Sequence, residues 1–252
     1  MAKIALIGYG KMGHIIERIA LERGNEITCR IDVDNLEDFD SEAFRNSDVA
    51  IEFTTPGTAV ANIRRCFEAG VPVVCGTTGW VNQDAGDGRT ALEAFKIDCA
   101  EGKGTLMWAS NYSVGVNVFM ALNSYLARIM NRLPQYSPTL IETHHIHKLD
   151  HPSGTAVTLA EGLVEEVERL SGWEEPDKGP VGADKLPVNF VRQGEVPGIH
   201  TIEWDSAVDS ITITHSAKSR EGFALGAVMA AEWLKGKEGW HPLSEMMAEI
   251  LK

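Results

Sequence analysis

Cysteine is scarce in this chain. The 252 residues contain four cysteines, at positions 29, 66, 75 and 99, and no two of them form a CxxC pair. Structural zinc sites and disulfide frameworks need closely spaced or paired cysteines, so the sequence disfavours both. Most of the four stand among apolar or strand-forming residues, which is typical of reduced core cysteines in a cytoplasmic protein.

Long apolar runs and an excess of basic residues are also missing. No apolar stretch approaches the roughly 20 residues that cross a bilayer. The apolar segment at residues 4–7 is too short for a signal peptide. The formal net charge of −13 argues against nucleic acid and anionic membranes as partners. We therefore expect a small-molecule ligand, and local basic groups must attract it if it is acidic.

A glycine pattern near the amino terminus has the form GxGxxG: Gly8, Tyr9, Gly10, Lys11, Met12 and Gly13. A predicted strand at residues 3–7 precedes it, and a predicted helix at about 14–23 follows. A second predicted strand, residues 26–31, ends at Asp32. This context is typical of a dinucleotide-binding unit, in which the acidic residue accepts hydrogen bonds from the adenosine ribose.

Each glycine of the pattern has an expected purpose. Gly8 permits the tight turn, Gly10 lets the backbone approach a pyrophosphate, and Gly13 allows the helix to pack closely on the strand. Without a ligand, the same residues would form a plain turn between strand and helix, an interpretation that the flanking strand, helix and Asp32 make the weaker one.

Strands and helices continue to alternate after this unit. Predicted strands at 48–53, 71–75 and 105–109 are separated by helices at about 58–68 and up to 99, which indicates a parallel, doubly wound sheet. Gly76, Thr77 and Thr78 follow one strand end, where ligands of such sheets bind, and we expect them near a nicotinamide. Taken alone, Gly-Thr-Thr-Gly is more typical of a simple turn than of a cofactor loop.

The second half of the chain follows another pattern. An apolar helix begins near Val118, residues 173–187 are expected to form a loop, and strands at 189–193, 200–205 and 210–216 alternate as antiparallel strands do. Helices at 223–234 and 243–251 return to the first domain. We predict a Rossmann-like dinucleotide-binding domain at 1–112 and 222–252. Residues 113–221 would form an α+β domain with a mixed or antiparallel sheet, for substrate binding and oligomerisation.

Four of the eight histidines fall within residues 142–156, together with Lys148. Strand-forming residues precede this stretch, and an amphipathic helix follows Pro152. Ser153 or Thr155 can cap that helix. The backbone N–H groups of Ser153, Gly154 and Thr155 are then expected to form an anion site. A proton donor and an ammonium group beside an anion site indicate catalysis.

Two other interpretations of the stretch remain open. Any single histidine of the four is more typically a surface or strand-end residue. A zinc site from His147 and His151 would need a helix, which Pro152 and the strand pattern disfavour.

The same residues resemble the signature of the 4-hydroxy-tetrahydrodipicolinate (dihydrodipicolinate) reductase family, E-x-H-x-x-x-K-x-D-x-P-S-G-T-A, at every fixed position from Glu142 to Ala156. The resemblance extends to the glycine pattern, to residues 76–79, to the segment 110–117 between the domains, and to a later element with Arg192, Gly194, Gly198 and His200.

This resemblance implies NAD(P)H-dependent reduction of 4-hydroxy-tetrahydrodipicolinate to tetrahydrodipicolinate, in the diaminopimelate route of lysine biosynthesis, by a homotetramer. His144 would be the proton donor, Lys148 the second catalytic residue, and His145 with Ser153, Gly154 and Thr155 would hold the substrate carboxylates. The implied cofactor contacts are residues 8–13, Asp32, Gly76, Thr77, Thr78, Ala109, Ser110, Asn111 and Tyr112. No resident metal is implied.

Two departures from the family pattern concern the cofactor domain. Glu52 stands where the family usually has an aspartate, and Val33 stands where some members have an arginine for a 2′-phosphate. We therefore expect NADH to be preferred, with NADPH possible. The alternatives from other classes are a zinc-dependent hydrolase and an NADH-sensing Rossmann regulator; the acidic chain weighs against the regulator, since its usual partner is DNA.

Overall fold

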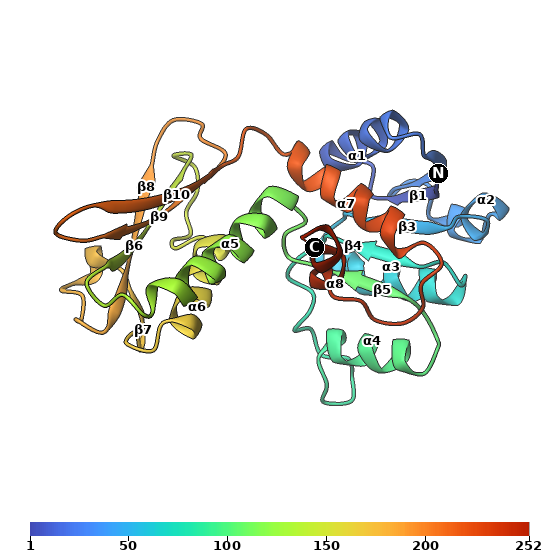
Figure 1. Cartoon of the computed structure of the whole chain (residues 1–252). Helices are drawn as coiled ribbons and strands as arrows, with labels where there is room; N and C mark the ends of the chain where they lie inside the picture. The colour runs from blue at the N-terminus through green and yellow to red at the C-terminus, as the bar shows by residue number, and fades with distance from the viewer. Residues whose placement is uncertain (252) are drawn as a thin grey trace. The chain divides into compact units, whose positions relative to one another are not determined.

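The chain folds into two compact units in the computed structural model, which describes residues 1–251. Unit 1 comprises Met1–Val114 and Glu221–Lys252, and unit 2 comprises Gly115–Arg220 (Figure 1). These boundaries differ by one or two residues from the division expected from the sequence. Within the described part of the chain, no helix is both long and apolar enough to cross a membrane.

Unit 1 is built on a five-stranded parallel sheet with the strand order β2-β1-β3-β4-β5. Its strands are β1 (Lys3–Ile7), β2 (Glu26–Ile31), β3 (Val49–Glu52), β4 (Val73–Cys75) and β5 (Leu106–Trp108). Its helices are α1 (Lys11–Glu22), η1 (Leu36–Asp40), α2 (Glu42–Arg45), α3 (Pro56–Glu68), α4 (Ala91–Ala100), α7 (Glu221–Leu234) and α8 (Leu243–Ile250). The structure confirms the predicted doubly wound sheet.

Helices cover both faces of this sheet. On one face α1, α7 and α8 pack against Leu6 and Ile51, and α3 and α4 pack against Ile7 and Val73 on the other. The all-parallel sheet is therefore buried on both sides, which explains its continuous apolar strands. All four cysteines are free thiols.

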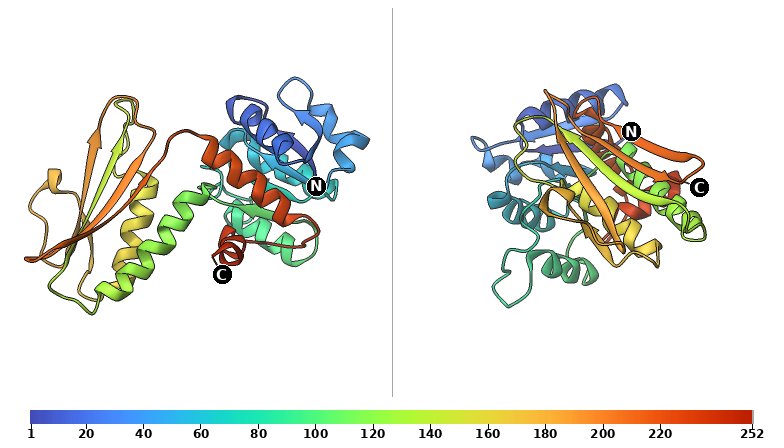
Figure 2. Two further views of the ribbon diagram at one scale, coloured as in Figure 1. Left: turned by 45° about the horizontal axis from the view of Figure 1, so that its top comes forward. Right: turned by 90° about the vertical axis from the view of Figure 1, so that its left-hand side faces the viewer.

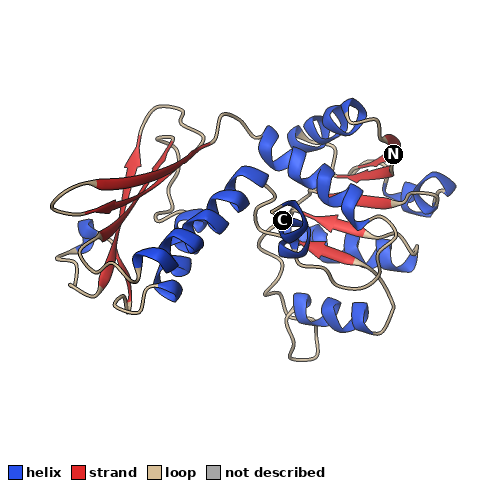
Figure 3. Cartoon of the chain, viewed as in Figure 1, coloured by secondary structure: helices blue, strands red, loops and turns tan. Residues whose placement is uncertain are grey.

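Unit 2 is built on a mixed sheet with the strand order β10-β9-β6-β8-β7. Its strands are β6 (Ser137–His144), β7 (Gly172–Glu174), β8 (Lys185–Arg192), β9 (Ile199–Asp205) and β10 (Ser210–Ser216). Helices α5 (Val114–Met130) and α6 (Gly154–Glu166) lie side by side on one face (Figures 2 and 3). Leu140, Ile202 and Trp204 form the core beneath them with Phe119 and Leu159.

Two details of the second domain differ from expectation. Residues 173–187 are not simply a loop, because they contain most of β7, a short 3-10 helix η2 (Pro176–Lys178) and the start of β8. A three-residue strand is too short for a period of two to reveal it. In addition, β8 runs parallel to both β6 and β7. The long connection through α6 permits this crossover, and apolar alternation is the same for either strand direction.

Candidate active site

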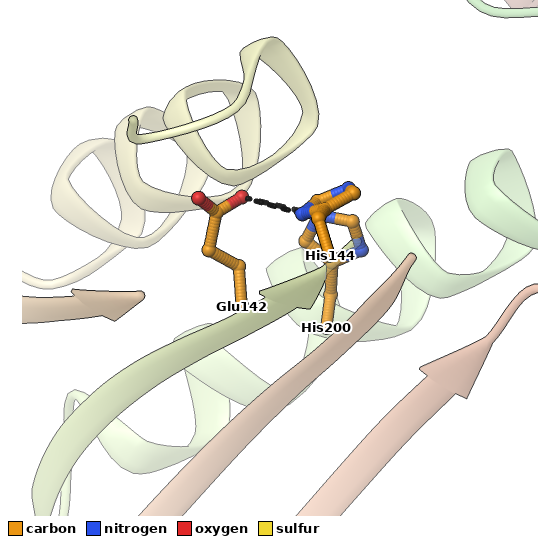
Figure 4. Close-up of side chains that lie close together, drawn as sticks. All are labelled: Glu142, His144 and His200. Atoms are coloured by element: carbon orange, nitrogen blue, oxygen red, sulfur yellow. Dashed lines mark ion pairs between the residues drawn. The ribbon is translucent and has the colours of Figure 1, made fainter. Parts of the chain in front are cut away.

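Strand β6 carries the first elements of the site. Its side chains alternate, so that Leu140, Glu142 and His144 are buried on the face covered by the helices. Glu142 stands opposite His200 of β9, and His144 stands opposite Arg192 of β8. The sheet register therefore brings one carboxylate and two imidazoles together (Figure 4).

The Glu142 carboxylate has no solvent exposure. Arg192 Nη2 donates to its Oε1 over 3.1 Å, and the Ser153 N–H donates to its Oε2 over 3.1 Å. His144 Nδ1 lies 3.3 Å from Oε2, an ion-pair distance without the angles of a regular hydrogen bond. Burial by itself would raise the pKa of Glu142, but interactions with His144, Ser153 and Arg192 outweigh it and lower that pKa to about 2. The carboxylate is therefore ionised at neutral pH.

His200 is the second buried imidazole of the site. Burial, followed by the charge of His144, lowers its pKa to about 4, although Glu142 opposes the shift. Its Nε2 lies 3.2 Å from the Ser153 hydroxyl, and its ring meets that of His144 edge to face at 5.2 Å between centroids. His200 is therefore a neutral hydrogen-bonding group at pH 7, and it packs beside the imidazole that faces Glu142.

His144 has two distinct nitrogen environments. Because a carboxylate can only accept, Nδ1 near Glu142 is the nitrogen that carries hydrogen in a neutral ring. A Cβ atom added at Gly198 would lie only 3.0 Å from Nε2, so this nitrogen packs against the glycine and a larger residue would crowd it. An imidazole held by a carboxylate at one nitrogen can deliver a proton from the other.

The turn after β6 is fixed by Arg192. Its Nε donates to the Lys148 carbonyl over 3.1 Å and its Nη2 to the Asp150 carbonyl over 2.8 Å. The Lys148 ammonium pairs with the Asp150 carboxylate at 2.8 Å and holds the pKa of that carboxyl below its usual value. One guanidinium thus binds both Glu142 and the backbone that carries Lys148.

Further along the turn, His151 anchors the chain just before Pro152. Its ring stacks on Phe190 at 3.9 Å between centroids, and its Nδ1 lies 2.5 Å from Glu175. Lys178 pairs with the same buried carboxylate. His151 therefore contributes to the position of the turn, and the ammonium of Lys178 argues against a cation site at Glu175.

The expected anion site at the start of α6 needs a correction. Ser153 is buried, its N–H donates to Glu142, and its hydroxyl caps the helix by accepting from the Ala156 N–H over 3.2 Å. The Ser153 N–H is therefore not part of an open anion site, because the buried carboxylate engages it. Gly154 and Thr155 begin the helix as expected, and they remain the candidates there.

The other two histidines of the stretch differ in burial. His145 is half-buried, and its Nδ1 has no hydrogen-bond partner within residues 1–251. His147 is largely exposed and lies 3.1 Å from exposed Glu195. Of these two, His145 is the better placed to bind a ligand.

Glu142, His144 and His200 are also residue types that bind metals, and their ligand atoms lie within 4.8 Å of one another. A divalent cation at this point would compete with the Arg192 guanidinium for Glu142. The Ser153 N–H engages the other carboxylate oxygen. The donors around the carboxylate therefore fit proton transfer better than metal binding.

Unit 1 contains a pocket of about 400 Å³ beside the carboxyl ends of β1, β2 and β3. Its walls are formed by Ile7, Gly8, Gly10, Ile31, Asp32, Val33, Leu36, Phe53, Thr54, Thr55, Gly57, Thr58, Ala61, Asn62 and Arg65. The strand order reverses at this edge of the sheet, which is where nucleotides bind in such folds.

The glycine pattern fits the expected cofactor. Gly8 has φ +92°, and a Cβ there would lie 2.2 Å from the Phe53 carbonyl oxygen. A Cβ at Gly13 would lie 2.4 Å from the Gly8 carbonyl oxygen, whereas nothing lies within 4 Å of one at Gly10. The first and third glycines thus allow close packing, and the second leaves the backbone open for a pyrophosphate.

Asp32 lies beside this loop. Its carboxylate accepts from the Tyr9 N–H over 3.2 Å and from the Val33 N–H over 2.9 Å. These contacts hold the carboxylate at the wall of the pocket, where ribose hydroxyls can donate to it.

Two side chains near Asp32, those of Arg30 and Tyr9, are bound to Glu17 and not to the pocket. Arg30 donates to Glu17 of α1, with Nε at 2.9 Å, and the Tyr9 hydroxyl donates to the same carboxylate. This hydrogen bond to Glu17 raises the pKa of Tyr9. Arg30 is thus bound to α1, and is not among the residues lining the pocket. Lys11 and Met12 begin α1 and do not line the pocket either.

The remaining expected cofactor residues lie at the ends of β4 and β5. Gly76 packs on the Phe53 ring so closely that a Cβ would lie 2.0 Å from it. The Thr77 hydroxyl accepts from the Thr54 N–H over 2.8 Å, and Thr78 is exposed. These contacts fix the loop that was expected near the nicotinamide.

The segment after β5 is largely structural. The Tyr112 hydroxyl donates to the carbonyls of Cys75 and Met107, and its ring is buried. Ala109 is also buried, whereas Ser110 is exposed. Asn111 accepts from the Ser113 N–H. Tyr112 can therefore reach a cofactor only through its backbone.

Sequence reasoning gave no role to several residues that the fold places at these sites. In unit 2 they are Glu142, Arg192 and His200, and in unit 1 Asn62 and Arg65. The alternation of β6 carried a signal for Glu142, because a carboxylate at a core-facing strand position needs buried partners. Arg192 and His200 matched a family element without a stated role, and their positions depend on sheet register. Asn62 and Arg65 depend on a helix face and had no local signal.

The pKa of Glu142 leads to a stability prediction. An acid with a folded-state pKa of about 2 and an ordinary value of 4.5 stabilises the fold above pH 4.5, and loses that contribution as the pH falls toward 2. We expect Glu142→Gln to be less stable than the wild type by roughly 3 kcal/mol at pH 7, and by less than half of that at pH 3. Urea unfolding at the two pH values measures the difference. Glu195→Gln, at an exposed pair, is the control and should change stability little. An equal deficit at both pH values would contradict the assignment.

Comparison with known proteins identifies the family. The family description "Dihydrodipicolinate reductase, N-terminus" matches residues 2–112, and "Dihydrodipicolinate reductase, C-terminus" matches residues 115–247. The 4-hydroxy-tetrahydrodipicolinate reductase of Christiangramia forsetii is 44% identical over 251 residues, covering 99% of each chain. That of Neisseria gonorrhoeae is 33% identical, over 92% of this chain and 83% of its own.

A solved structure shares the fold. A dihydrodipicolinate reductase from Paenisporosarcina sp., with dipicolinate bound, superposes with a TM-score of 0.77 at 22% identity, over 96% of this chain and 97% of the other. Together with the matches over nearly the whole sequence, these findings show that the chain belongs to the dihydrodipicolinate reductase family.

Proposed function

We propose that this chain reduces 4-hydroxy-tetrahydrodipicolinate to tetrahydrodipicolinate with NADH as the preferred reductant, in the diaminopimelate route of lysine biosynthesis, and that His144 donates the proton. The observation that carries the assignment of His144 is its buried pairing with Glu142, with 3.3 Å between Nδ1 and Oε2. His144 also ends the strand that leads into the turn with Lys148 and then into α6. A zinc-dependent hydrolase and a redox-sensing regulator are not favoured by the family membership.

The proposed reduction needs an acid that donates a proton and a positive charge near the substrate ring. The substrate must first lose its 4-hydroxyl and a hydrogen of the neighbouring carbon as water, which leaves a ring carbon conjugated with the cyclic imine. A bound dihydronicotinamide would then supply hydride to that carbon. As negative charge spreads over the neighbouring carbon and nitrogen, a positioned acid must deliver a proton. An imidazolium at His144 can supply it from Nε2, while ionised Glu142 holds the ring through Nδ1. The Lys148 ammonium adds positive charge on the same turn.

The two substrate carboxylates require separate partners. The turn that follows β6 carries His145 and Lys148 and leads to the N-terminus of α6 at Gly154 and Thr155. Together these residues offer an imidazole, an ammonium and backbone N–H groups. Ser153 acts indirectly in this proposal, by capping α6 and holding Glu142. A ligand fixed at both carboxylates would be held in one orientation for hydride transfer.

The first test of the proposal is His144→Gln, which we expect to lower kcat by roughly 10²–10⁴, the usual effect of losing a general acid. The dissociation constant of NADH should not change. His147→Gln is the matched control, because His147 lies three residues away on the same turn and is largely exposed. Near-native kcat for His144→Gln, or an equal loss in both variants, would exclude His144 as the proton donor.

Cofactor preference depends on the charges around Asp32. A 2′-phosphate on the adenosine ribose would bring about −1.5 to −2 charges close to this carboxylate. Val33, which is exposed, offers no cation, and Arg30 is bound to Glu17. Repulsion without a compensating cation on the β2 side supports a preference for NADH.

We therefore expect kcat/KM to be about tenfold higher with NADH than with NADPH, equivalent to about 1.4 kcal/mol. Val33→Arg should narrow this ratio by raising kcat/KM for NADPH. Arg30→Ala should leave the ratio nearly unchanged, because Glu17 already holds that guanidinium. A wild-type ratio at or below one would contradict the preference.

The sheet of unit 2 supports the proposal of a homotetramer. Thr139, Ile141 and Thr143 of β6 point away from the helix-covered face and are half-exposed. On neighbouring strands, Thr201 and Thr214 join through their hydroxyls at 3.1 Å. This face is rich in threonine and isoleucine, with Glu203 and Asp205 toward one end. Such a face and the edge strand β10 are suited to self-association.

Light scattering at micromolar concentration measures the assembly directly. We expect a mass of four chains for the wild type. Ile141→Lys places a charge on the proposed interface and should lower the mass. Glu161→Lys reverses a charge on the exposed side of α6, outside that face, and should leave the mass unchanged. A monomeric mass for the wild type would contradict the proposal.

A further inference from the structure

The pocket of unit 1 has a single cationic side chain on its wall within the residues that the structure describes. That side chain is Arg65 of α3, and Asp32 is the only acidic one. Both basic residues considered from the sequence, Arg30 and Lys11, lie outside the lining. Arg65 is therefore the charge that an incoming nucleotide would meet opposite Asp32.

Helical spacing explains why Arg65 reaches this pocket. Thr58, Ala61, Asn62 and Arg65 follow one another at intervals of three, one and three residues, so they share one face of α3. This face forms one wall of the pocket. Val33 and Leu36, which follow β2, also line the pocket.

The guanidinium of Arg65 is held by an aromatic ring and not by a carboxylate. Its central carbon lies 4.9 Å from the centroid of the Phe39 ring. Among the described residues, no carboxylate forms an ion pair with it, in contrast with Arg30 and Glu17. A planar guanidinium stacked on a ring keeps its charge available to a second planar group.

We propose that Arg65 binds the adenine ring of the cofactor by stacking, as the layer between that ring and Phe39. This inference rests on the proposed use of a dinucleotide. Asp32 lies next to the glycine loop and is suited to the ribose hydroxyls, so the adenine extends beyond it, between Leu36 and α3. Small and apolar side chains on both sides, among them Val33 and Ala61, suit a flat ring.

Stacking on adenine and recognition of a 2′-phosphate have different effects on the affinities for NADH and NADPH. A phosphate on the ribose 2′-oxygen would lie beside Asp32 and Val33, on the β2 side of the pocket, whereas Arg65 projects from α3. Arg65 therefore contributes equally to the affinity for NADH and for NADPH, and it does not set the preference between them.

The test is the equilibrium dissociation constants of NADH and NADPH, measured by nucleotide fluorescence without substrate. We expect Arg65→Ala to raise both constants about tenfold and by the same factor, a size within the range of cation–π contacts. Arg65→Lys should recover little, because an ammonium lacks the planar face. Arg64→Ala is the matched control, since Arg64 is the adjacent residue, lies near Phe95 and does not line the pocket.

The remaining outcomes would contradict either the stacking of Arg65 on adenine or the use of the cofactor. A loss confined to NADPH would assign Arg65 to the 2′-phosphate and overturn the stacking. Unchanged constants in Arg65→Ala, or an equal loss in Arg64→Ala, would overturn it as well. A wild-type protein that binds neither nucleotide would instead overturn the proposed use of the cofactor. Thermal unfolding of each variant shows that the fold is retained.

Discussion

The ionised carboxylate of Glu142 is the constraint on which the substrate unit depends. A buried charge without partners is costly, and removing one partner of a buried pair destabilises proteins by about 3–5 kcal/mol. Glu142 therefore holds its partners in place, and those partners come from separate parts of the chain. Arg192 belongs to β8, the Ser153 N–H precedes α6, and His144 ends β6. The carboxylate thus joins two strands, a helix start and the acid of the proposed reaction.

The same carboxylate acts on the catalytic turn through Arg192. This guanidinium binds Glu142 and the carbonyls of Lys148 and Asp150. The position of the Lys148 backbone is therefore coupled to the buried charge, although Lys148 itself does not contact Glu142 directly. The buried charge of Glu142 therefore contributes both to the stability of unit 2 and to the fixed positions of the site residues.

The sequence alone predicted the features that depend on local patterns. The strand and helix around Gly8–Gly13 made the location of the unit 1 pocket predictable, and each glycine has a close contact or an open space that agrees with its expected purpose. The edge strand Ser210–Ser216 was predicted with its observed bounds. Such features follow from residue periodicity and from backbone freedom at glycine, both of which are visible in a short window.

The features that sequence reasoning did not predict depend on long-range packing. The Ser153 N–H was expected to bind an anion from outside, but Glu142, eleven residues earlier, engages it. Arg192 reaches Glu142 because β8 runs parallel to β6, which apolar alternation cannot indicate. Arg65 has a helical spacing with Thr58 that was visible, but nothing in the sequence showed that this face of α3 lines the pocket.

Glu142 orients the His144 ring, and the tautomer of His144 tests this orientation most directly. Nitrogen-15 NMR of the neutral imidazole in the wild-type protein should show hydrogen on Nδ1, facing the carboxylate. In Glu142→Gln, a mixture of the two tautomers should replace it, because an amide can donate as well as accept. A wild-type ring with hydrogen on Nε2 and a bare Nδ1, or the same spectrum in both proteins, would contradict the account.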